Sequence, residues 1–264
     1  MALSGQEDVI SEGSYVLLYL DGKRKYLTKV EKERVFHTHK GYVVMDSLIG
    51  LKYGSRVKSN IGADFVALRP TPWDYVLKVA RRTQIIYPKD MALMIFKLGL
   101  RPGMRIVEAG TGSGALTCAL AFFVRPGVVY SYDIDPQFQE VARKNLERAG
   151  LLDYVVLKTK DITEGIDEED IDAVVLDMAT PWLVVPHAHK ALKGAGHFVS
   201  FSPTVNQVEK TVLELRRYGF IDIKVYELLL REMKVEEGAV RPETLMIGHT
   251  GYITFARKAL KHQA

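Results

Sequence analysis

The sequence predicts an α/β protein with a doubly wound parallel sheet and a small β module before it. Three observations support this prediction. Residues 106–114 read Ile-Val-Glu-Ala-Gly-Thr-Gly-Ser-Gly and run directly into a helical apolar pattern at residues 115–124. Apolar runs and helical patterns then alternate toward the C-terminus, which is typical of parallel sheets. Residues 14–66, in contrast, show only short apolar runs between turn residues.

The glycine turn indicates the class of ligand. A β-branched strand, a tight turn and a helix form the first half of a nucleotide-binding βαβ unit. The dinucleotide fingerprint would place its third glycine at position 115, where this chain has Ala115. Glu108 puts a carboxylate near the ligand, which opposes a pyrophosphate and favours a cationic amino-acid end. The pattern therefore favours S-adenosylmethionine over NAD.

Composition limits the function classes. The 264 residues suffice for one large or two unequal domains with a buried core. No long uncharged apolar run or signal-peptide pattern is present, so we expect a cytoplasmic protein without membrane contact. Cys118 is the only cysteine, which excludes an internal disulfide and a cysteine-based zinc site. We expect no metal cofactor.

Positive charge is concentrated at the front of the chain. Residues 1–90 hold 15 Lys and Arg against 10 Asp and Glu, whereas the remaining residues hold 21 against 22. We predict a β module over residues 1–69, with Asp21 and Gly22 at a hairpin turn. It is interpreted either as a nucleic-acid-binding appendage or as a solvated basic surface. The basic residues in question are Lys23, Arg24, Lys25, Lys29, Lys40, Lys52, Arg56 and Lys58.

Prolines mark the connection to the larger domain, which we expect over residues 70–264. A helix is predicted over residues 73–82, and a second helix from Asp90 to residue 98, with Asp90 as its N-cap. Tyr87, beside a proline, is either a stacking platform for a base or a packed linker tyrosine.

The later elements follow the order of a doubly wound sheet. The acidic residues 164–170 are expected in a surface loop, and residues 234–250 in a long loop suited to contact a substrate. Strands are expected from residue 104 and over residues 128–133, 154–157, 171–177, 196–201, 220–230 and 252–256, and helices over residues 115–124, 136–149, 184–193 and 205–218.

Carboxylates stand at or just beyond the ends of these strands. Asp133 lies roughly twenty residues beyond the glycines, where an acid accepts both ribose hydroxyls of a nucleoside, and Asp135 is assigned to cap the next helix. Phe138 is either a wall for the adenine or a core residue, and Asp161 either accepts the adenine amino group or caps a turn. Asp177 ends an apolar strand and is the first candidate for the chemistry.

Four stretches together resemble the tRNA adenine-N1 methyltransferases that act on the T-loop, in their prokaryotic and archaeal homo-oligomeric branch. The match runs from about Pro70 to the end of the chain. The stretches are residues 81–90 (Arg-Arg-Thr-Gln-Ile-Ile-Tyr-Pro-Lys-Asp), residues 108–114, Leu176-Asp177 followed by Pro181-Trp182, and Arg241-Pro242 with His249-Thr250-Gly251.

The resemblance implies a class I S-adenosylmethionine-dependent methyltransferase whose seven-stranded sheet has an antiparallel last strand. It also implies a homotetramer that methylates adenine 58 of tRNA, with adenine 57 as a possible second target. Asp177 matches the catalytic residue, and Thr180 replaces an acidic residue common in the family. The cofactor residues expected are Gln84, Glu108, Gly110, Gly112, Ser113, Gly114, Ala115, Leu116, Asp133, Phe138, Asp161 and Asp177, and the substrate residues are Tyr87, Arg241, His249 and Thr250.

The expected reaction needs positioning more than proton transfer, because adenine N1 already carries a lone pair. Asp177 would accept a hydrogen bond from the exocyclic amine and favour the transition state. Three alternatives stay open: a methyltransferase acting on a protein carboxylate or small molecule, a non-catalytic RNA-binding subunit, and an NAD-dependent oxidoreductase. The last is opposed by Glu108 and Ala115.

Overall fold

The computed structural model describes residues 8–80 and 84–260. The chain divides into two compact units, Met1–Lys78 and Val79–Ala264. Helix α1 (Pro72–Lys78) is the last element of the first unit. Residues 81–83, the Arg-Arg-Thr that opens the stretch before Gln84, lie outside the described residues.

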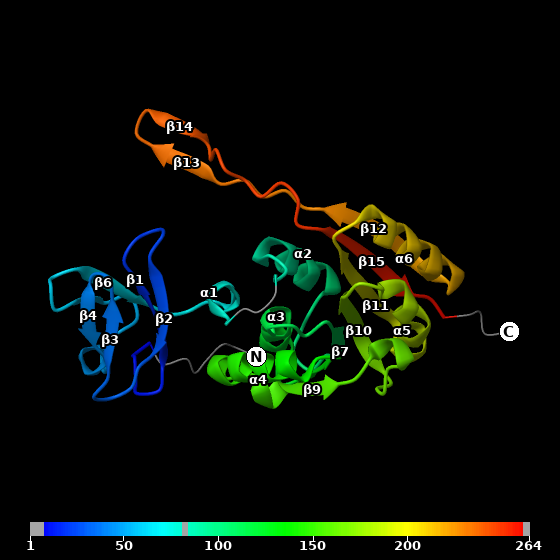
Figure 1. Cartoon of the computed structure of the whole chain (residues 1–264), viewed down its shortest axis with the longest axis horizontal. Coiled ribbons are helices and arrows are strands. Elements are labelled where there is room, and N and C mark those ends of the chain that lie inside the picture. The colour runs from blue at the N-terminus through cyan, green and yellow to red at the C-terminus, as the bar shows by residue number, and fades with distance from the viewer. Residues whose placement is uncertain (1–7, 81–83, 261–264) are drawn as a thin grey trace. The chain divides into compact units, whose positions relative to one another are not determined.

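The first unit is built from antiparallel strands (Figure 1). Four strands form a sheet in the order β2-β1-β6-β5, and β3 and β4 form a separate hairpin. The predicted hairpin turn is confirmed, since Tyr19 of β1 pairs with Lys25 of β2 and the Asp21 carboxylate accepts the backbone N–H of Arg24 at 2.9 Å. The strands are β1 (Tyr15–Tyr19), β2 (Lys25–Lys29), β3 (Val35–Thr38), β4 (Gly41–Val44), β5 (Arg56–Lys58) and β6 (Asp64–Leu68), with a 3-10 turn η1 (Met45–Leu48).

This unit has a core of its own. Val16 and Leu18 of β1 and Phe65 of β6 are fully buried in one apolar cluster. Helix α1 joins the unit through Tyr75, whose ring meets that of Tyr15 edge-on at 5.9 Å. Burial of these apolar side chains stabilises the fold of the unit.

The second unit contains the predicted seven-stranded sheet, in the order β12-β15-β11-β10-β7-β8-β9. Strands β11, β10, β7, β8 and β9 pair in parallel, and β15 pairs antiparallel to both β11 and β12. Figure 1 shows β15, in red, between its two partners. The strands are β7 (Arg105–Ala109), β8 (Val128–Asp133), β9 (Val155–Thr159), β10 (Ile171–Asp177), β11 (Leu192–Ser202), β12 (Phe220–Glu227) and β15 (Tyr252–Lys258).

Helices cover both faces of this sheet. Helices α3 and α4 contact β7, β8 and β9, whereas α5 and α6 contact β11, β12 and β15. The apolar cluster on the α5 side contains Val107, Val174 and Phe198 of three different strands. The helices are α2 (Pro88–Leu98), α3 (Ala115–Val124), α4 (Pro136–Ala149), α5 (Val185–Ala191) and α6 (Val205–Arg217), with 3-10 turns η2 (Leu152–Tyr154), η3 (Ile162–Glu164) and η4 (Pro181–Val184).

Asp90 is not the N-cap of helix α2, contrary to the sequence prediction. The helix begins at Pro88 with Tyr87 as N-cap, because proline is already set for the first helical position and lacks the N–H that a cap would satisfy. Asp90 lies within the first turn of the helix and is fully buried. Its Oδ1 pairs with Lys89 Nζ at 2.8 Å, and its Oδ2 accepts the Thr250 hydroxyl at 2.8 Å. A partner 160 residues away therefore determines its role.

Residues 228–250, which we name the arm, contain a hairpin instead of the expected long loop. Strand β13 (Met233–Glu236) pairs antiparallel with β14 (Ala239–Pro242), and Figure 1 shows the hairpin extending from the end of β12 and β15. Lys89 Nζ holds the two ends of the arm together by donating to Leu228 O at 2.6 Å and Thr250 Oγ1 at 2.7 Å. The arm exposes Leu229, Leu230, Met233, Val235, Val240, Leu245, Met246 and Ile247.

Candidate active site

The glycine turn after β7 is shaped by close backbone contacts. Gly110 has φ +88°, and a Cβ there would lie 1.9 Å from the carbonyl oxygen of Asp177. Gly114 has φ +76°, and its Cβ would lie 3.0 Å from that of Ala142 on α4. Glycine is therefore required at both positions, once for the approach of two strand ends and once for helix packing.

Two cavities lie beside this turn. The first has a volume of about 370 Å³ and is lined by Gln84, the turn residues Gly110–Ser113 and the start of α3. The second has a volume of about 440 Å³ and is lined by residues 160–163 and 178–180 among others. Gly110, Asp133 and Ile134 border both cavities. Together they can hold an elongated ligand that crosses the carboxyl ends of β7 and β8, as in other open α/β sheets.

Asp133 stands at the junction of the two cavities. Its Oδ2 accepts the backbone N–H of Gly112 at 2.9 Å, and its Oδ1 accepts that of Asp135 at 3.0 Å. Each oxygen keeps one lone pair free, so the carboxylate is held in place and can still accept two hydroxyl groups. Asp135 caps α4 by accepting the Gln137 N–H at 2.7 Å, as predicted.

Asp177 ends β10 and lines the first cavity. Burial raises its pKa to about 6, because the charged form loses hydration. Among the described residues, none donates a hydrogen bond to its side chain. The carboxylate is thus ionised at neutral pH and available to a ligand in the cavity.

The sequence analysis expects the Glu108 carboxylate beside the ligand, whereas the structure encloses it in the interior. Glu108 is fully buried and lines neither cavity. Burial raises its pKa to about 8, so the group is mostly neutral at pH 7. It accepts Ser131 Oγ at 2.7 Å, and Ser131 in turn contacts Thr111 Oγ1 at 2.7 Å. Glu108 therefore supports the glycine turn indirectly, through Ser131 and Thr111.

Most of the residues expected to bind the cofactor line one of the two cavities. Gly114 borders neither cavity, since it faces α4. Phe138 lines the first cavity and Asp161 the second, so the two residues expected at the adenine lie in different cavities. Asp161 also caps η3 by accepting the Thr163 N–H at 2.8 Å. The first cavity is lined by Gln84, Gly110, Gly112, Ser113, Ala115, Leu116, Asp133, Phe138 and Asp177.

Ile134 is a lining residue that the sequence reasoning missed. Its side chain is 72% exposed, although it is large and apolar, and it borders both cavities. A signal was available, because an isoleucine between two acids at a strand end has no core to enter. Met178, Thr180 and Leu183 were also missed as lining residues of the second cavity.

The four expected substrate residues line neither cavity. Thr250 lies next to the segment of Tyr87 through its bonds to Lys89 and Asp90. His249 Nδ1 contacts Glu227 Oε1 at 2.7 Å, and this hydrogen bond raises the pKa of the imidazole. Arg241, on the exposed β14, donates to the Thr244 hydroxyl at 2.9 Å.

The described residues hold neither a metal-binding cluster nor a membrane-spanning helix. Residues 8–80 and 84–260 contain no cluster of three or more His, Cys, Asp or Glu side chains placed to bind a metal ion. Over the same residues, no helix has the length and apolar character needed to span a membrane.

Comparisons with known proteins agree with this geometry. The chain is 41% identical to a protein of Methanocaldococcus jannaschii named tRNA (adenine(57)-N(1)/adenine(58)-N(1))-methyltransferase TrmI, over 92% of this chain and 95% of the relative. A solved SAM-dependent O-methyltransferase from Thermotoga maritima has a TM-score of 0.88 and 35% identity, covering 97% of each chain. The tRNA (m1A58) methyltransferase TrmI from Aquifex aeolicus has a TM-score of 0.81 and 33% identity, covering 96% of this chain and 100% of its own.

Family membership follows from the match along the chain and from the shared fold. Residues 64–241 match the family described as tRNA methyltransferase complex GCD14 subunit, a range that includes the residues lining both cavities and β14 up to Arg241. The seven-stranded order and the antiparallel β15 are those of a class I methyltransferase. The chain therefore belongs to the GCD14 family of tRNA methyltransferases.

Proposed function

We infer that this chain is an S-adenosylmethionine-dependent methyltransferase that modifies N1 of adenine 58 in the tRNA T-loop. The observation that carries the inference is Asp177, which lines the first cavity beside the glycine turn, is ionised at neutral pH and accepts no hydrogen bond from any other described side chain. Relatives with 41% and 34% identity over 92% of the chain are named for this reaction. A carboxylate in that position suits a base with an exocyclic amine.

The residues present fit S-adenosylmethionine. The absent Cβ at Gly110 lets the end of β7 approach the backbone of Asp177, and Asp133 retains lone pairs for ribose hydroxyls. We assign the first cavity to the amino-acid half and the second, with Ile134 and Asp161, to the adenine. When bound, S-adenosylmethionine supplies a methyl group on a sulfonium, which the lone pair of the aromatic ring nitrogen N1 of adenine can accept.

Asp177 orients the target base. Its carboxylate accepts the exocyclic amine of adenine, which places N1 toward the first cavity and opposes the positive charge that develops on the ring. No side chain needs to remove a proton before the transfer, because N1 is unprotonated at neutral pH. Burial strengthens this hydrogen bond by reducing competition from water.

We assign Tyr87 to stacking on the extruded base. A T-loop adenine must leave its stack before an enzyme reaches N1, and aromatic rings commonly receive such bases. Tyr87 is fixed as the N-cap of α2, and the adjoining Lys89-Asp90 pair is bonded to Thr250 at the base of the arm. This bonding supports a substrate region that includes Tyr87, His249 and Thr250, with Arg241 farther out on the arm.

Adenine 57 is included in the proposal as a second target. The Methanocaldococcus jannaschii relative is named for both positions, whereas the Thermus thermophilus relative with 34% identity is named for position 58 alone. Adjacent adenines present the same N1 and amine to Asp177, so the choice between them depends on how the T-loop is held.

We propose that the first unit binds tRNA. Of the eight basic residues that the sequence singles out there, only Arg24 forms an ion pair with another described residue, Asp21. Lys52, Arg56 and Lys58 are exposed and follow one another closely along the chain. Unpaired surface cations are available to phosphates, and their binding would weaken with added salt.

We also propose that the chain works as a homotetramer in the cytoplasm, where its tRNA substrate is found. Support for self-association comes from the arm, whose eight exposed apolar side chains lie within 19 residues, 229–247. Apolar patches of this kind mark protein interfaces. Sedimentation of the full chain would test the tetramer, and a monomer at micromolar concentration would contradict it.

The test uses methyl-labelled S-adenosylmethionine and three tRNA transcripts: unmodified, with guanosine at position 58, and with guanosine at position 57. We expect 1-methyladenosine in the unmodified transcript and its loss when position 58 is guanosine. Label in protein or in small molecules instead would favour the O-methyltransferase reading suggested by the Thermotoga maritima structure. Binding of tRNA without any transfer would favour a non-catalytic subunit.

A further inference from the structure

Tyr132 connects three parts of the proposed cofactor site. It immediately precedes Asp133 on β8 and is only 1% exposed. Its backbone carbonyl accepts the N–H groups of Gly110 at 2.9 Å and Thr111 at 3.3 Å, and the residue is one of those that line the second cavity. Its hydroxyl, at the far end of the side chain, donates to Glu168 Oε2 at 2.5 Å.

Glu168 is the exception within an acidic segment. Residues 164–170 were expected in a surface loop, but Glu168 is only 8% exposed, while Asp167 and Glu169 on either side are exposed. Its Oε1 forms an ion pair with Lys158 Nζ on β9, which compensates the cost of burying the carboxylate. Lys158 Nζ also donates to the Tyr132 hydroxyl at 3.3 Å and lies 5.2 Å from the centre of its ring.

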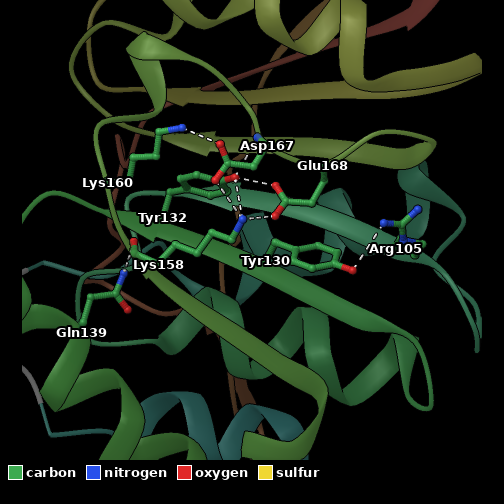
Figure 2. A network of polar contacts seen from close by, with 8 residues as sticks. All are labelled: Arg105, Tyr130, Tyr132, Gln139, Lys158, Lys160, Asp167 and Glu168. Atoms are coloured by element: carbon green, nitrogen blue, oxygen red, sulfur yellow. Dashed lines mark hydrogen bonds and ion pairs between the residues drawn. The ribbon is translucent and has the colours of Figure 1, made fainter.

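These three residues form the triad Tyr132, Glu168 and Lys158, shown in Figure 2. Burial and the hydrogen bond to Glu168 raise the pKa of Tyr132 to about 12, so its hydroxyl remains a donor at neutral pH. Although burial alone would lower the pKa of Lys158, its bonds to Glu168 and Asp167 raise it, so the amine remains charged. Each member therefore keeps the protonation state that the contacts require.

The triad fixes both ends of one cavity wall. Residues 160–163, which line the second cavity, lie between Lys158 and Glu168 in the chain. After residues 160–163 in the chain, the backbone N–H of Asp167 donates to the Tyr132 hydroxyl at 3.1 Å, and Asp167 Oδ2 pairs with Lys158 at 3.0 Å. On the N-terminal side of residues 160–163, Lys158 O accepts a hydrogen bond from Gln139 Nε2 on α4 at 3.0 Å. The same Nε2 donates to Thr111 Oγ1 at 3.2 Å. The wall and the glycine turn are thus held through the same side chains.

We propose that the triad is a positioning unit that holds residues 160–163 against Asp133 and thereby sets the affinity for the nucleoside half of the methyl donor. The proposal rests on the assignment of the second cavity to adenine. None of the three residues lines the first cavity, where Asp177 lies, so the triad acts on donor binding and not on the transfer itself.

The principal test removes one hydroxyl group of the triad and compares the result with a matched control variant on the same strand. Tyr132→Phe removes the hydroxyl of the triad. Tyr130→Phe removes a hydroxyl two residues away, which contacts Arg105 Nη2 at 3.4 Å and lines neither cavity, while its ring also lies near Lys158 Nζ at 5.9 Å. We expect Tyr132→Phe to raise the Kd of S-adenosylhomocysteine and the KM of the donor about tenfold. Tyr130→Phe should change both less than about twofold.

The kinetic pattern separates positioning from simple stability. Under the proposal, kcat at saturating donor and the KM for tRNA stay near wild-type values in Tyr132→Phe. Glu168→Gln should raise the donor KM as well, and the double variant should be no worse than the more affected single variant, because both break one contact. Equal effects in the Tyr130 and Tyr132 variants, or a lower melting temperature with an unchanged donor KM, would overturn it.

Titration calorimetry with S-adenosylhomocysteine, which gives its Kd, distinguishes failure of this proposal from failure of the proposed function. If the wild-type chain does not bind S-adenosylhomocysteine, the assignment of the cofactor is wrong, and with it the premise of the triad proposal. If the wild-type chain binds it and the Tyr132→Phe and Glu168→Gln variants bind equally well, only the triad proposal is wrong.

Discussion

The carboxyl ends of the neighbouring strands β7 and β10 each carry an acid with a raised pKa, yet the two ends differ in what surrounds them. Glu108 is enclosed between the sheet and α3, has a pKa of about 8 and accepts Ser131. Asp177 has a pKa of about 6 and faces the first cavity. A raised pKa therefore does not by itself identify a catalytic acid. Access to a cavity separates the two strand ends, because Glu108 also has a carboxylate oxygen, Oε1, without a hydrogen-bond partner but lines neither cavity.

The largest effect should come from Asp177→Asn, which keeps the size of the side chain and removes its charge. We expect kcat for tRNA methylation to fall roughly 10²- to 10³-fold, as for the loss of one preorganised electrostatic contact. Binding of S-adenosylhomocysteine should change little, which calorimetry would verify. Near-normal turnover in this variant would remove the proposed distinction between the two strand ends.

Gly110→Ala tests the place where β7 meets β10. The new Cβ would lie 1.9 Å from Asp177 O, so we expect loss of measurable donor binding and a destabilisation of several kcal/mol. Gly150→Ala is the matched control, since Gly150 also has positive φ (+66°) but nothing within 4 Å of its Cβ position. It should cost only about 1 kcal/mol in urea unfolding. Similar costs in both variants would show that the close approach is unimportant.

The pH dependence should report Asp177 and not Glu108. Because protonation removes an acceptor and a negative charge, kcat/KM for tRNA should fall about tenfold per pH unit below about pH 6. The residual rate of Asp177→Asn should lack this dependence. If kcat/KM of the wild-type chain changed slope near pH 8, and this change were absent from Glu108→Gln, the titration would instead belong to Glu108.

The smallest effect on activity should come from Glu108→Gln. Glu108 is mostly neutral at pH 7, so an amide of similar shape should keep kcat and donor KM within about twofold. Stability should behave differently. The folded chain holds a proton on Glu108 between its ordinary pKa of 4.5 and about 8, so wild-type stability falls as pH rises through that window. Urea unfolding at pH 5 and pH 8 should show the variant gaining stability relative to wild type at the higher pH.

Local patterns were enough to predict much of the sheet and one edge of the site. The expected strands 128–133 and 171–177 and the helix 136–149 coincide with β8, β10 and α4 residue for residue. Each has its own local signals, such as β-branched runs or Asp135 before a proline. Asp133 lines both cavities for a related reason, because a strand end in a parallel sheet opens into the crevice.

Contacts between residues far apart in the chain could not be predicted from local sequence patterns. Asp90 looked like a helix cap, but its partner Thr250 lies 160 residues away. Glu168 looked like one acid of a solvated loop, but Lys158 and Tyr132 of two neighbouring strands hold it in the interior. The spacing of residues along the chain carries no information about such pairs, since only the assembled sheet brings the strands together.

By itself, the sequence determined the nucleotide-binding turn, the seven-stranded fold through its resemblance to known methyltransferases, and Asp177 as the acid at the central strand end. These depend on backbone geometry and periodicity, which act over a few residues. Only the tertiary structure decided the electrostatic role of each acid. Glu108 and Asp177 look alike as strand-end carboxylates, but hydration and hydrogen-bond partners set their pKa values, and both depend on which face of the folded sheet each side chain enters.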